Sequence, residues 1–341
     1  MARYNESMRF IFPLALTLLI LPSVAFAQFL GGDALDESTA FSASIDPQYP
    51  APYTNATLSV LSASLDLANA TMKVSVNKKQ IYSGSVQDLS IRLGGAGNMT
   101  KIDVTISSSG KSYTQNLSVQ PQDVVLVAEP LSSAPPLYPG KTLVPLEGSV
   151  RVVAMANLRD TKGKAIDPAT LSYSWTVDET SLSNASGIGK SAIIVDSPFK
   201  YRSTDVSVSI KSQDGSLVGG DSLSLVASDP VIRVYENDPL LGIVFNRAIS
   251  GNYKITSSED SLYAAPFSMP TSSGLPVIQW FLNGDLAQTG KTITLRPTGS
   301  GQGSASLSLI ASSGESTRAT QEFSLSFGAI QSSVLNKLFG L

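Results

Sequence analysis

One short pattern recurs three times along the chain and constrains its fold more than any other feature. Each copy alternates polar and apolar residues around an apolar centre and ends on a polar residue that favours a turn. The copies are Lys73-Val74-Ser75-Val76-Asn77, Ser174-Trp175-Thr176-Val177-Asp178 and Gln279-Trp280-Phe281-Leu282-Asn283. Their centres lie roughly 100 residues apart, which is the length of one small β-sandwich domain. The pattern therefore predicts three copies of one β unit.

Period-two alternation accompanies each copy. Downstream of each centre, an alternating segment closes on a glycine that favours a turn: residues 102–106 precede Gly110, residues 206–210 precede Gly215 and residues 305–309 precede Gly314. Such alternation places one side of a strand in a core and the other side in water. Asn-Gly and Asp-Gly pairs between the segments favour hairpin turns. We therefore expect an all-β chain of three antiparallel sandwiches.

Prolines mark the boundaries between the repeats. Pro121 and Pro230 each lie between the last strand of one unit and the first strand of the next. The predicted sandwiches span residues 34–121, 122–229 and 230–328. Because the junctions are short, we expect a semi-rigid rod on the order of 100 Å long, from strands of about eight residues that rise about 3.3 Å per residue.

The amino-terminal segment has the three parts of an export signal. Two arginines precede an apolar run over residues 10–27, which ends in Ala25-Phe26-Ala27. This order predicts a signal peptide over residues 1–27 that is cleaved before Gln28. A retained membrane anchor is the alternative, because a helix over the apolar run would be about 27 Å long, close to the thickness of a bilayer core.

The absence of cysteine bears on the compartment. An exported protein without disulfides is stabilised by its cores alone, which is common in bacteria. The sequence therefore indicates a bacterial product that is periplasmic, at the cell surface or extracellular. Residues 329–341 carry apolar side chains at helical spacing and predict a short amphipathic tail that packs on the last sandwich or on a partner.

The second and third copies, YSWTVDE and IQWFLNGD, resemble the strand that carries the core tryptophan of bacterial PKD and immunoglobulin-like domains. The similarity extends through LYPGKTLVPLEGSVRVVAMANL, ASGIGKSAIIVDSP and DPVIRVYENDPLLGIVFNRAI. Over residues 34–328 the chain resembles a bacterial exported multi-domain PKD/Ig-like surface protein of unassigned activity. The resemblance implies a β-sandwich fold and extracellular placement, and it carries no catalytic residues. The first repeat has Val74 where the other two have tryptophan.

Composition excludes most enzyme classes. The chain contains no His and no Cys, so it has no imidazole base, no thiolate nucleophile and no His-ligated or Cys-ligated zinc. Its net charge is −3, and 15% of its residues are charged, which is unlike a nucleic-acid-binding protein. We expect no catalytic residues and no nucleic-acid partner, and contact with a membrane only through residues 10–27 if they are retained.

Three classes of function follow from these observations. The first is a non-enzymatic spacer, scaffold or adhesion module at the cell envelope, whose partner is a protein or glycan at the cell surface. The second is a binding protein that recognises a glycan, a pilus or another envelope partner through loops or a free sheet edge such as Ala305–Ile310. The third is a hydrolase that uses two carboxylates.

Acidic residues cluster at three places that we expect to be loops: Asp178-Glu179, Glu236-Asn237-Asp238 and Glu259-Asp260. The triplet Glu236, Asn237 and Asp238 lies just after the second junction. Carboxylate and amide oxygens are ligands for Ca²⁺. The triplet is therefore the candidate for a structural calcium site, with an ordinary surface loop as the alternative. No other cofactor is expected.

Aromatic residues divide into two groups. Val74, Trp175 and Trp280 occupy equivalent mid-strand positions, so we expect all three side chains in the cores. The only tyrosines placed to stack on a ligand lie in loop-like stretches: Tyr49, Tyr53, Tyr138 and Tyr253.

Overall fold

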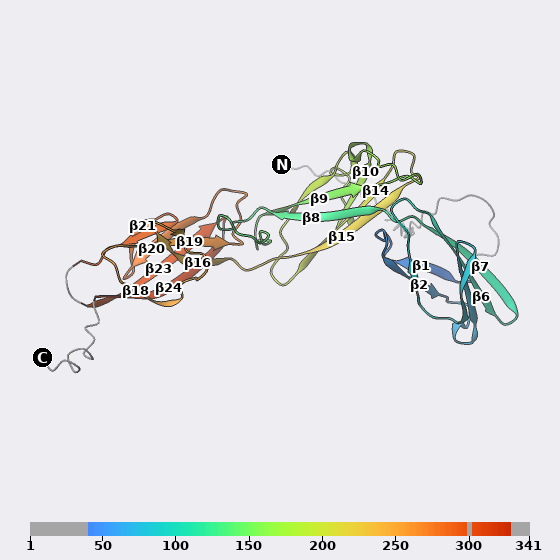
Figure 1. The fold of residues 1–341 in the computed structure, drawn as a ribbon, viewed down its shortest axis with the longest axis horizontal. Helices are drawn as coiled ribbons and strands as arrows, with labels where there is room; N and C mark the ends of the chain where they lie inside the picture. The colour runs from blue at the N-terminus through green and yellow to red at the C-terminus, as the bar shows by residue number, and fades with distance from the viewer. Residues whose placement is uncertain (1–39, 299–301, 329–341) are drawn as a thin grey trace, which may run out of the picture. The chain divides into compact units, whose positions relative to one another are not determined.

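The computed structural model describes residues 40–298 and 302–328, and this part of the chain is all-β (Figure 1). Its sheets pair into three sandwiches that follow one another along the sequence. The structure thus confirms the predicted fold class of three tandem immunoglobulin-like antiparallel sandwiches. The predicted signal segment 1–27 and the predicted tail 329–341 lie outside the described residues.

The first sandwich packs a three-stranded sheet, in the order β1-β2-β5, on a four-stranded sheet, in the order β4-β3-β6-β7. Asp66 caps a short 3₁₀ turn, Leu67–Asn69, that precedes β3. The strands are β1 (Ser42–Asp46), β2 (Asn55–Leu61), β3 (Thr71–Val76), β4 (Lys79–Ser85), β5 (Leu89–Arg92), β6 (Thr100–Ser108) and β7 (Lys111–Val119).

The second sandwich repeats this arrangement with the sheets β13-β9-β8 and β11-β10-β14-β15, and a short strand, β12, also pairs with β10. A 3₁₀ turn, Pro168–Thr170, again precedes the strand that carries the anchor residue. The strands are β8 (Asp123–Pro130), β9 (Ser149–Asn157), β10 (Ser172–Val177), β11 (Thr180–Ser181), β12 (Gly187–Ile188), β13 (Ala192–Asp196), β14 (Ser203–Lys211) and β15 (Val218–Val226).

The third sandwich has the sheets β17-β16-β19-β22 and β18-β24-β23-β20-β21. It differs from the others in that β18 pairs in parallel with the last strand, β24. The strands are β16 (Val231–Asp238), β17 (Gly242–Ile243), β18 (Gly251–Ile255), β19 (Asp260–Phe267), β20 (Val277–Leu282), β21 (Asp285–Thr289), β22 (Thr292–Leu295), β23 (Gly303–Ser313) and β24 (Thr317–Phe327).

The three anchor residues are equivalent in the structure. Val74, Trp175 and Trp280 are at most 1% exposed, and each lies opposite an apolar residue of the following long strand, as Trp175 lies opposite Val208. The two indoles also make the same bond, because Trp175 donates its Nε1–H to the Lys190 carbonyl at 2.8 Å and Trp280 donates to the Gly290 carbonyl at 2.9 Å. Each buried indole therefore packs in its core and has a hydrogen-bond acceptor for its N–H group.

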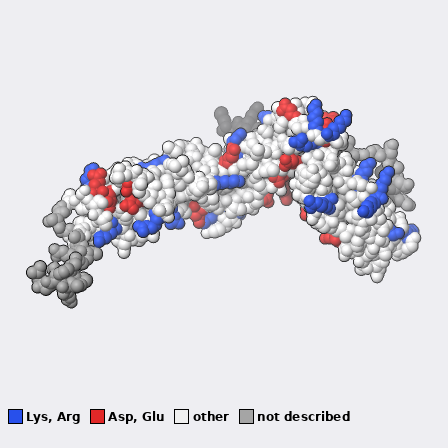
Figure 2. Space-filling view, in the orientation of Figure 1, with Lys and Arg blue, Asp and Glu red and all other residues white. Residues whose placement is uncertain are grey.

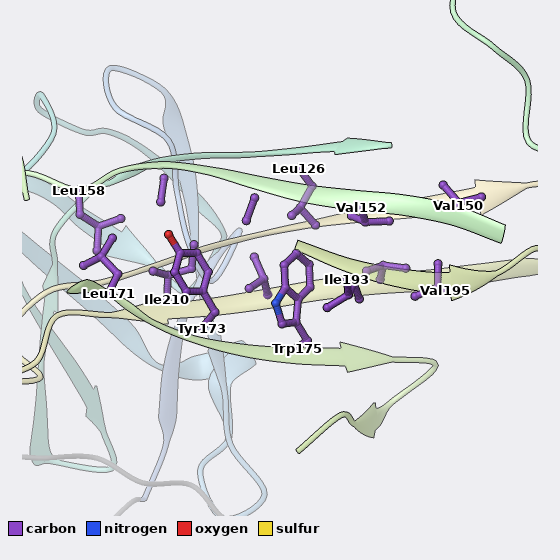
Figure 3. Close-up of a cluster of buried hydrophobic side chains, with 14 of the residues drawn as sticks. Leu126, Val150, Val152, Leu158, Leu171, Tyr173, Trp175, Ile193, Val195 and Ile210 are labelled. Carbon is purple, nitrogen blue, oxygen red and sulfur yellow. The ribbon is translucent and has the colours of Figure 1, made fainter. Parts of the chain in front are cut away.

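Each sandwich has its own hydrophobic core between its two sheets. The buried clusters run from Phe41 to Val119, from Leu126 to Leu225 and from Ile232 to Leu325. Figure 3 shows the second of these, where Trp175 and Tyr173 on one sheet face aliphatic side chains of the other, including Val152 and Leu126. The apolar positions of the alternating segments therefore supply the cores, as their periodicity predicts.

The prediction of a free sheet edge is wrong. The stretch Ala305–Ile310 lies within β23, which pairs with β20 on one side and with β24 on the other. It is therefore an interior strand with no free edge for docking. The reason is that β24 folds back as a hairpin over the whole length of β23, while the sheet continues through β20 to the short edge strand β21.

Candidate functional site: the junctions between sandwiches

The acidic triplet lies in a strand, where the sequence had indicated a loop. Glu236, Asn237 and Asp238 end β16, because Gly242–Ile243 turns back and pairs with the last two of them. Asn237 donates its side-chain amide to Ser261 Oγ at 3.2 Å. Among the residues that the structure describes, no group of three or more acidic side chains is placed to hold a metal ion. The calcium site stays a prediction.

The carboxylate of Asp238 has a structural task. Its Oδ1 accepts the backbone N–H groups of Leu241 at 2.8 Å and Leu240 at 2.7 Å. These two bonds favour the ionised carboxylate and hold the pKa of Asp238 below its usual range. Asp238 thus fixes the turn between β16 and β17, whose leucines 240 and 241 are exposed.

The four tyrosines singled out from the sequence have different surroundings. Tyr53 lies in a loop and is exposed. Tyr253 lies within β18, and its hydroxyl donates to Asp260 Oδ2 at 3.2 Å; burial and the nearby carboxylate both raise the pKa of this hydroxyl. Tyr138 makes an edge contact with Phe267, with ring centroids 5.4 Å apart. Tyr49 lines a groove over β10, β14 and β15.

The junction between the second and third sandwiches is closed by backbone pairing. The loop between β8 and β9 runs alongside residues 268–271, which follow β19. Ser133 donates its N–H to the Met269 carbonyl at 2.7 Å and accepts from the N–H of Ser268 at 3.1 Å, and Thr271 donates to the Leu131 carbonyl at 2.9 Å. Paired backbone of this kind restrains a junction far more than a flexible linker does.

Buried side chains strengthen the same junction. Ser268 is 1% exposed, and its hydroxyl lies within hydrogen-bonding distance of the carbonyls of Val144, at 3.2 Å, and Ser228, at 3.0 Å. Across the junction, the carboxylate of Glu147 accepts the hydroxyls of Ser316 and Thr317, the latter at 3.0 Å. These bonds join the loop before β9 to the β23–β24 hairpin.

A buried glutamine extends the β8–β9 pairing of the second sandwich to its boundary with the first. Gln122 is 4% exposed, and its amide makes two bonds with Arg159, donating Nε2–H to the carbonyl at 3.0 Å and accepting the backbone N–H at 2.8 Å. Gly97 donates its N–H to the Pro121 carbonyl at 2.9 Å. A Cβ at Gly97 would lie 2.3 Å from the Asp160 carbonyl oxygen, so the approach requires glycine.

Little in the amino-acid sequence indicates these junction residues. Glu147, Ser268 and Gln122 occur in stretches without periodicity, and their partners are 37 to 170 residues away. The proline at each boundary was the only available signal, and it indicates where a strand ends without indicating what holds the next sandwich.

The charged residues form no single-sign surface on the face that Figure 2 shows, where both signs occur in small groups among uncharged residues. In the described part of the chain, no helix has the length and apolar character needed to cross a membrane.

Comparison with solved structures finds weak similarity to several multi-domain arrays. The three N-terminal domains of the bacteriophage RB49 highly immunogenic outer capsid protein (Hoc) are 14% identical, with a TM-score of 0.23, over 86% of this chain and 100% of that one. The central fibronectin-III array of RIM-binding protein is 9% identical, with a TM-score of 0.28, over 84% and 96%. The fibronectin(III)-like modules of Clostridium thermocellum CbhA are 10% identical, with a TM-score of 0.22, over 58% and 94%. At these scores the likeness supports no statement about function. No protein-family model and no curated protein matches the sequence.

Proposed function

We propose that this chain is a non-enzymatic, exported protein of the cell envelope, in which three immunoglobulin-like sandwiches in series act as a spacer, scaffold or adhesion module. The observation that carries the proposal is the pairing of backbone across the junction of the second and third sandwiches, from Ser133 to Met269 and from Thr271 to Leu131. A spacer must transmit position and force from one unit to the next. Hydrogen-bonded junctions serve that purpose and have no role in a set of independent binding domains.

The third sandwich has a second feature that suits a protein under tension. Residues 251–255 of β18 pair in parallel with residues 323–327 of β24. When a parallel pair is pulled from the beginning of one strand and the end of the other, its hydrogen bonds are loaded together rather than one by one. In the described residues of the first two sandwiches every pairing is antiparallel.

This arrangement predicts a hierarchy of mechanical strength. In single-molecule stretching of the full chain from its two ends, the third sandwich should unfold at the highest force, because once β16 has detached from β19 the load reaches the β18–β24 bonds, which must break together. A Gly-Ser insertion after Gly284, in the turn between β20 and β21, lengthens the extension step of this sandwich alone and identifies its event. Unfolding of the third sandwich before the other two would contradict the proposal.

Export is the part of the proposal that concerns the amino terminus. When the full gene is expressed in a bacterial host with an intact secretion pathway, the protein should appear outside the cytoplasm with Gln28 as its first residue. Intact-mass and amino-terminal peptide analysis of the fractionated protein checks this. An Ala25→Arg/Ala27→Arg variant, which removes both small residues of the cleavage site, should retain the segment. A cytoplasmic protein that begins with Met would contradict export.

A further inference from the structure

A groove of about 510 Å³ lies on the outer face of the second sandwich. Its floor is formed by β10, β14 and β15, and one wall is formed by residues 46–49, the last residue of β1 and the three that follow it. The volume falls within the range of small-ligand sites, about 300–1,000 Å³. That wall belongs to the first sandwich, so the groove lies where the first two sandwiches meet. Neither the cores nor the contact between the sandwiches explains the row of hydroxyl residues along the floor.

Alternation produces a floor of hydroxyl groups. Val206, Val208 and Ile210 of β14 point into the core, so the residues between them face outward. Cross-strand pairing then places the hydroxyl residues side by side, Ser174 beside Ser209, Thr176 beside Ser207, and Ser207 beside Ser222. The hydroxyls therefore form a flat array with spacings of about 4.8 Å between strands and about 6.7 Å along each strand.

Tyr49 supplies the aromatic part of the wall. Its hydroxyl donates to Ser209 Oγ at 3.2 Å. Its ring lies against Gly220, where a Cβ would be only 2.5 Å from the ring carbon Cδ2. A residue larger than glycine would thus push the ring away from the floor. Tyr49 is one of the tyrosines that the sequence singled out for stacking.

The charges of the groove have one sign. Asp46 and Asp221 line it, and none of its lining residues is Lys or Arg. Asp221 contributes its backbone, because it pairs opposite the core residue Val208 and its carboxylate turns to the other sheet, where Oδ2 accepts the Leu126 N–H at 2.7 Å. The exposed carboxylate of Asp46, with no Lys or Arg in the lining, disfavours anionic ligands such as phosphates and uronates.

We propose that this groove binds a neutral saccharide. Hydroxyls, the Asp46 carboxylate and the amide of Gln48 are donors and acceptors that match sugar hydroxyls, and the Tyr49 ring offers an apolar surface to the C–H face of a sugar ring. The inference goes beyond the proposed spacer role and does not depend on it. A saccharide site would let the second sandwich attach to a glycan while the array transmits force.

The test is titration of the full chain with cellotetraose, chitotetraose and mannotetraose, with tetragalacturonate as the anionic comparison, followed by calorimetry and by saturation-transfer NMR. We expect at least one neutral tetrasaccharide to bind with a Kd in the range of about 0.1–1 mM, which corresponds to about 4–5.5 kcal/mol. Tetragalacturonate should bind at least tenfold more weakly.

A matched pair of variants locates the site. Ser207→Arg fills the floor of the groove, whereas Ser224→Arg adds the same side chain to the same outer face at an exposed position that does not line it. Ser207→Arg should weaken binding at least tenfold, and Ser224→Arg should leave it unchanged. Ser174→Arg is a second blocking variant if Ser207→Arg does not fold. Absence of binding by all three neutral probes, or equal effects of the blocking and control variants, would overturn the proposal, while the stretching experiment remains a separate test of the spacer role.

Discussion

Replacing Trp280 with alanine should lower the free energy of unfolding of the third sandwich by about 3–5 kcal/mol. The indole is fully buried between the two sheets. Its removal leaves a cavity that a sheet paired on both sides of β20 closes poorly. The substitution also leaves the Gly290 carbonyl without its donor. A loss of this size is a large share of the stability of one domain.

Chemical denaturation measures this effect cleanly because the chain has only two tryptophans. In Trp280→Ala, the remaining fluorescence comes from Trp175 and reports the second sandwich, while far-UV circular dichroism reports all three. The third sandwich should unfold at lower denaturant concentration than the Trp175 signal indicates. Leu286→Ala, at a position 56% exposed on the edge strand β21, should change stability by less than about 0.5 kcal/mol. Equal effects of the two substitutions would show that Trp280 is not an essential core residue.

The fold was predictable because its information is local and repeated. Period-two alternation around residues 74, 175 and 280 identifies the central strands, and the same alternation upstream and downstream supplies their neighbours. Val74 replaces tryptophan in the first sandwich and still packs without exposure. The anchor position therefore tolerates different apolar side chains when the surrounding strands keep their pattern.

Order within a sheet was less predictable than the strands themselves. Periodicity gives Ala305–Ile310 the same appearance whether it lies at an edge or in the interior, and the pairing with β20 decides the matter. The stretch Glu236-Asn237-Asp238 was mispredicted for the same reason. Three polar residues in a row indicate a loop, but in the structure the last two pair with the Gly242–Ile243 segment. Both errors arise because the strands that pair with a segment lie far from it in the sequence. The alternation of residues within the segment does not identify them.

The candidate sites were less predictable again. Tyr49 could be singled out as a tyrosine in a loop, but Ser209 and Gly220, which hold its ring and hydroxyl, lie about 160 residues away. Serines on the outer face of a strand look the same in sequence whether they face open solvent or a groove. The role of such serines depends on which other segment of the chain packs next to them. The sequence of one strand does not specify that segment.

The second large effect concerns the junction between the first and second sandwiches, where Gly97→Ala should destabilise the chain far more than Gly110→Ala. The two glycines have almost the same left-handed backbone, with φ of 80° and 77°. Each alanine therefore meets the same conformational cost, about 1–2 kcal/mol. Only at Gly97 does the added Cβ also collide with the backbone, 2.3 Å from the Asp160 oxygen and 2.7 Å from the Arg159 oxygen.

That collision acts on hydrogen bonds that hold the two sides of the junction. The carbonyl of Gly97 accepts from Gln120 Nε2 at 2.8 Å, and Arg159 is bonded on both sides to the Gln122 amide. Displacing the Gly97 loop from Arg159 and Asp160 should expose Gln122, which is buried in the native chain. Loss of its two bonds adds about 1–3 kcal/mol to the conformational cost.

Hydrogen exchange distinguishes this outcome from ordinary destabilisation. In Gly97→Ala the amides of Gly97's neighbour Asn98 and of Arg159 should lose protection together, although Arg159 belongs to the next sandwich. In Gly110→Ala, where nothing lies within 4 Å of the added Cβ, only the β6–β7 hairpin should exchange faster. If both variants lose the same stability and Arg159 stays protected in each, the close approach at Gly97 does not hold the two sandwiches together. The first junction would then be a hinge, and the spacer role would rest on the second junction alone.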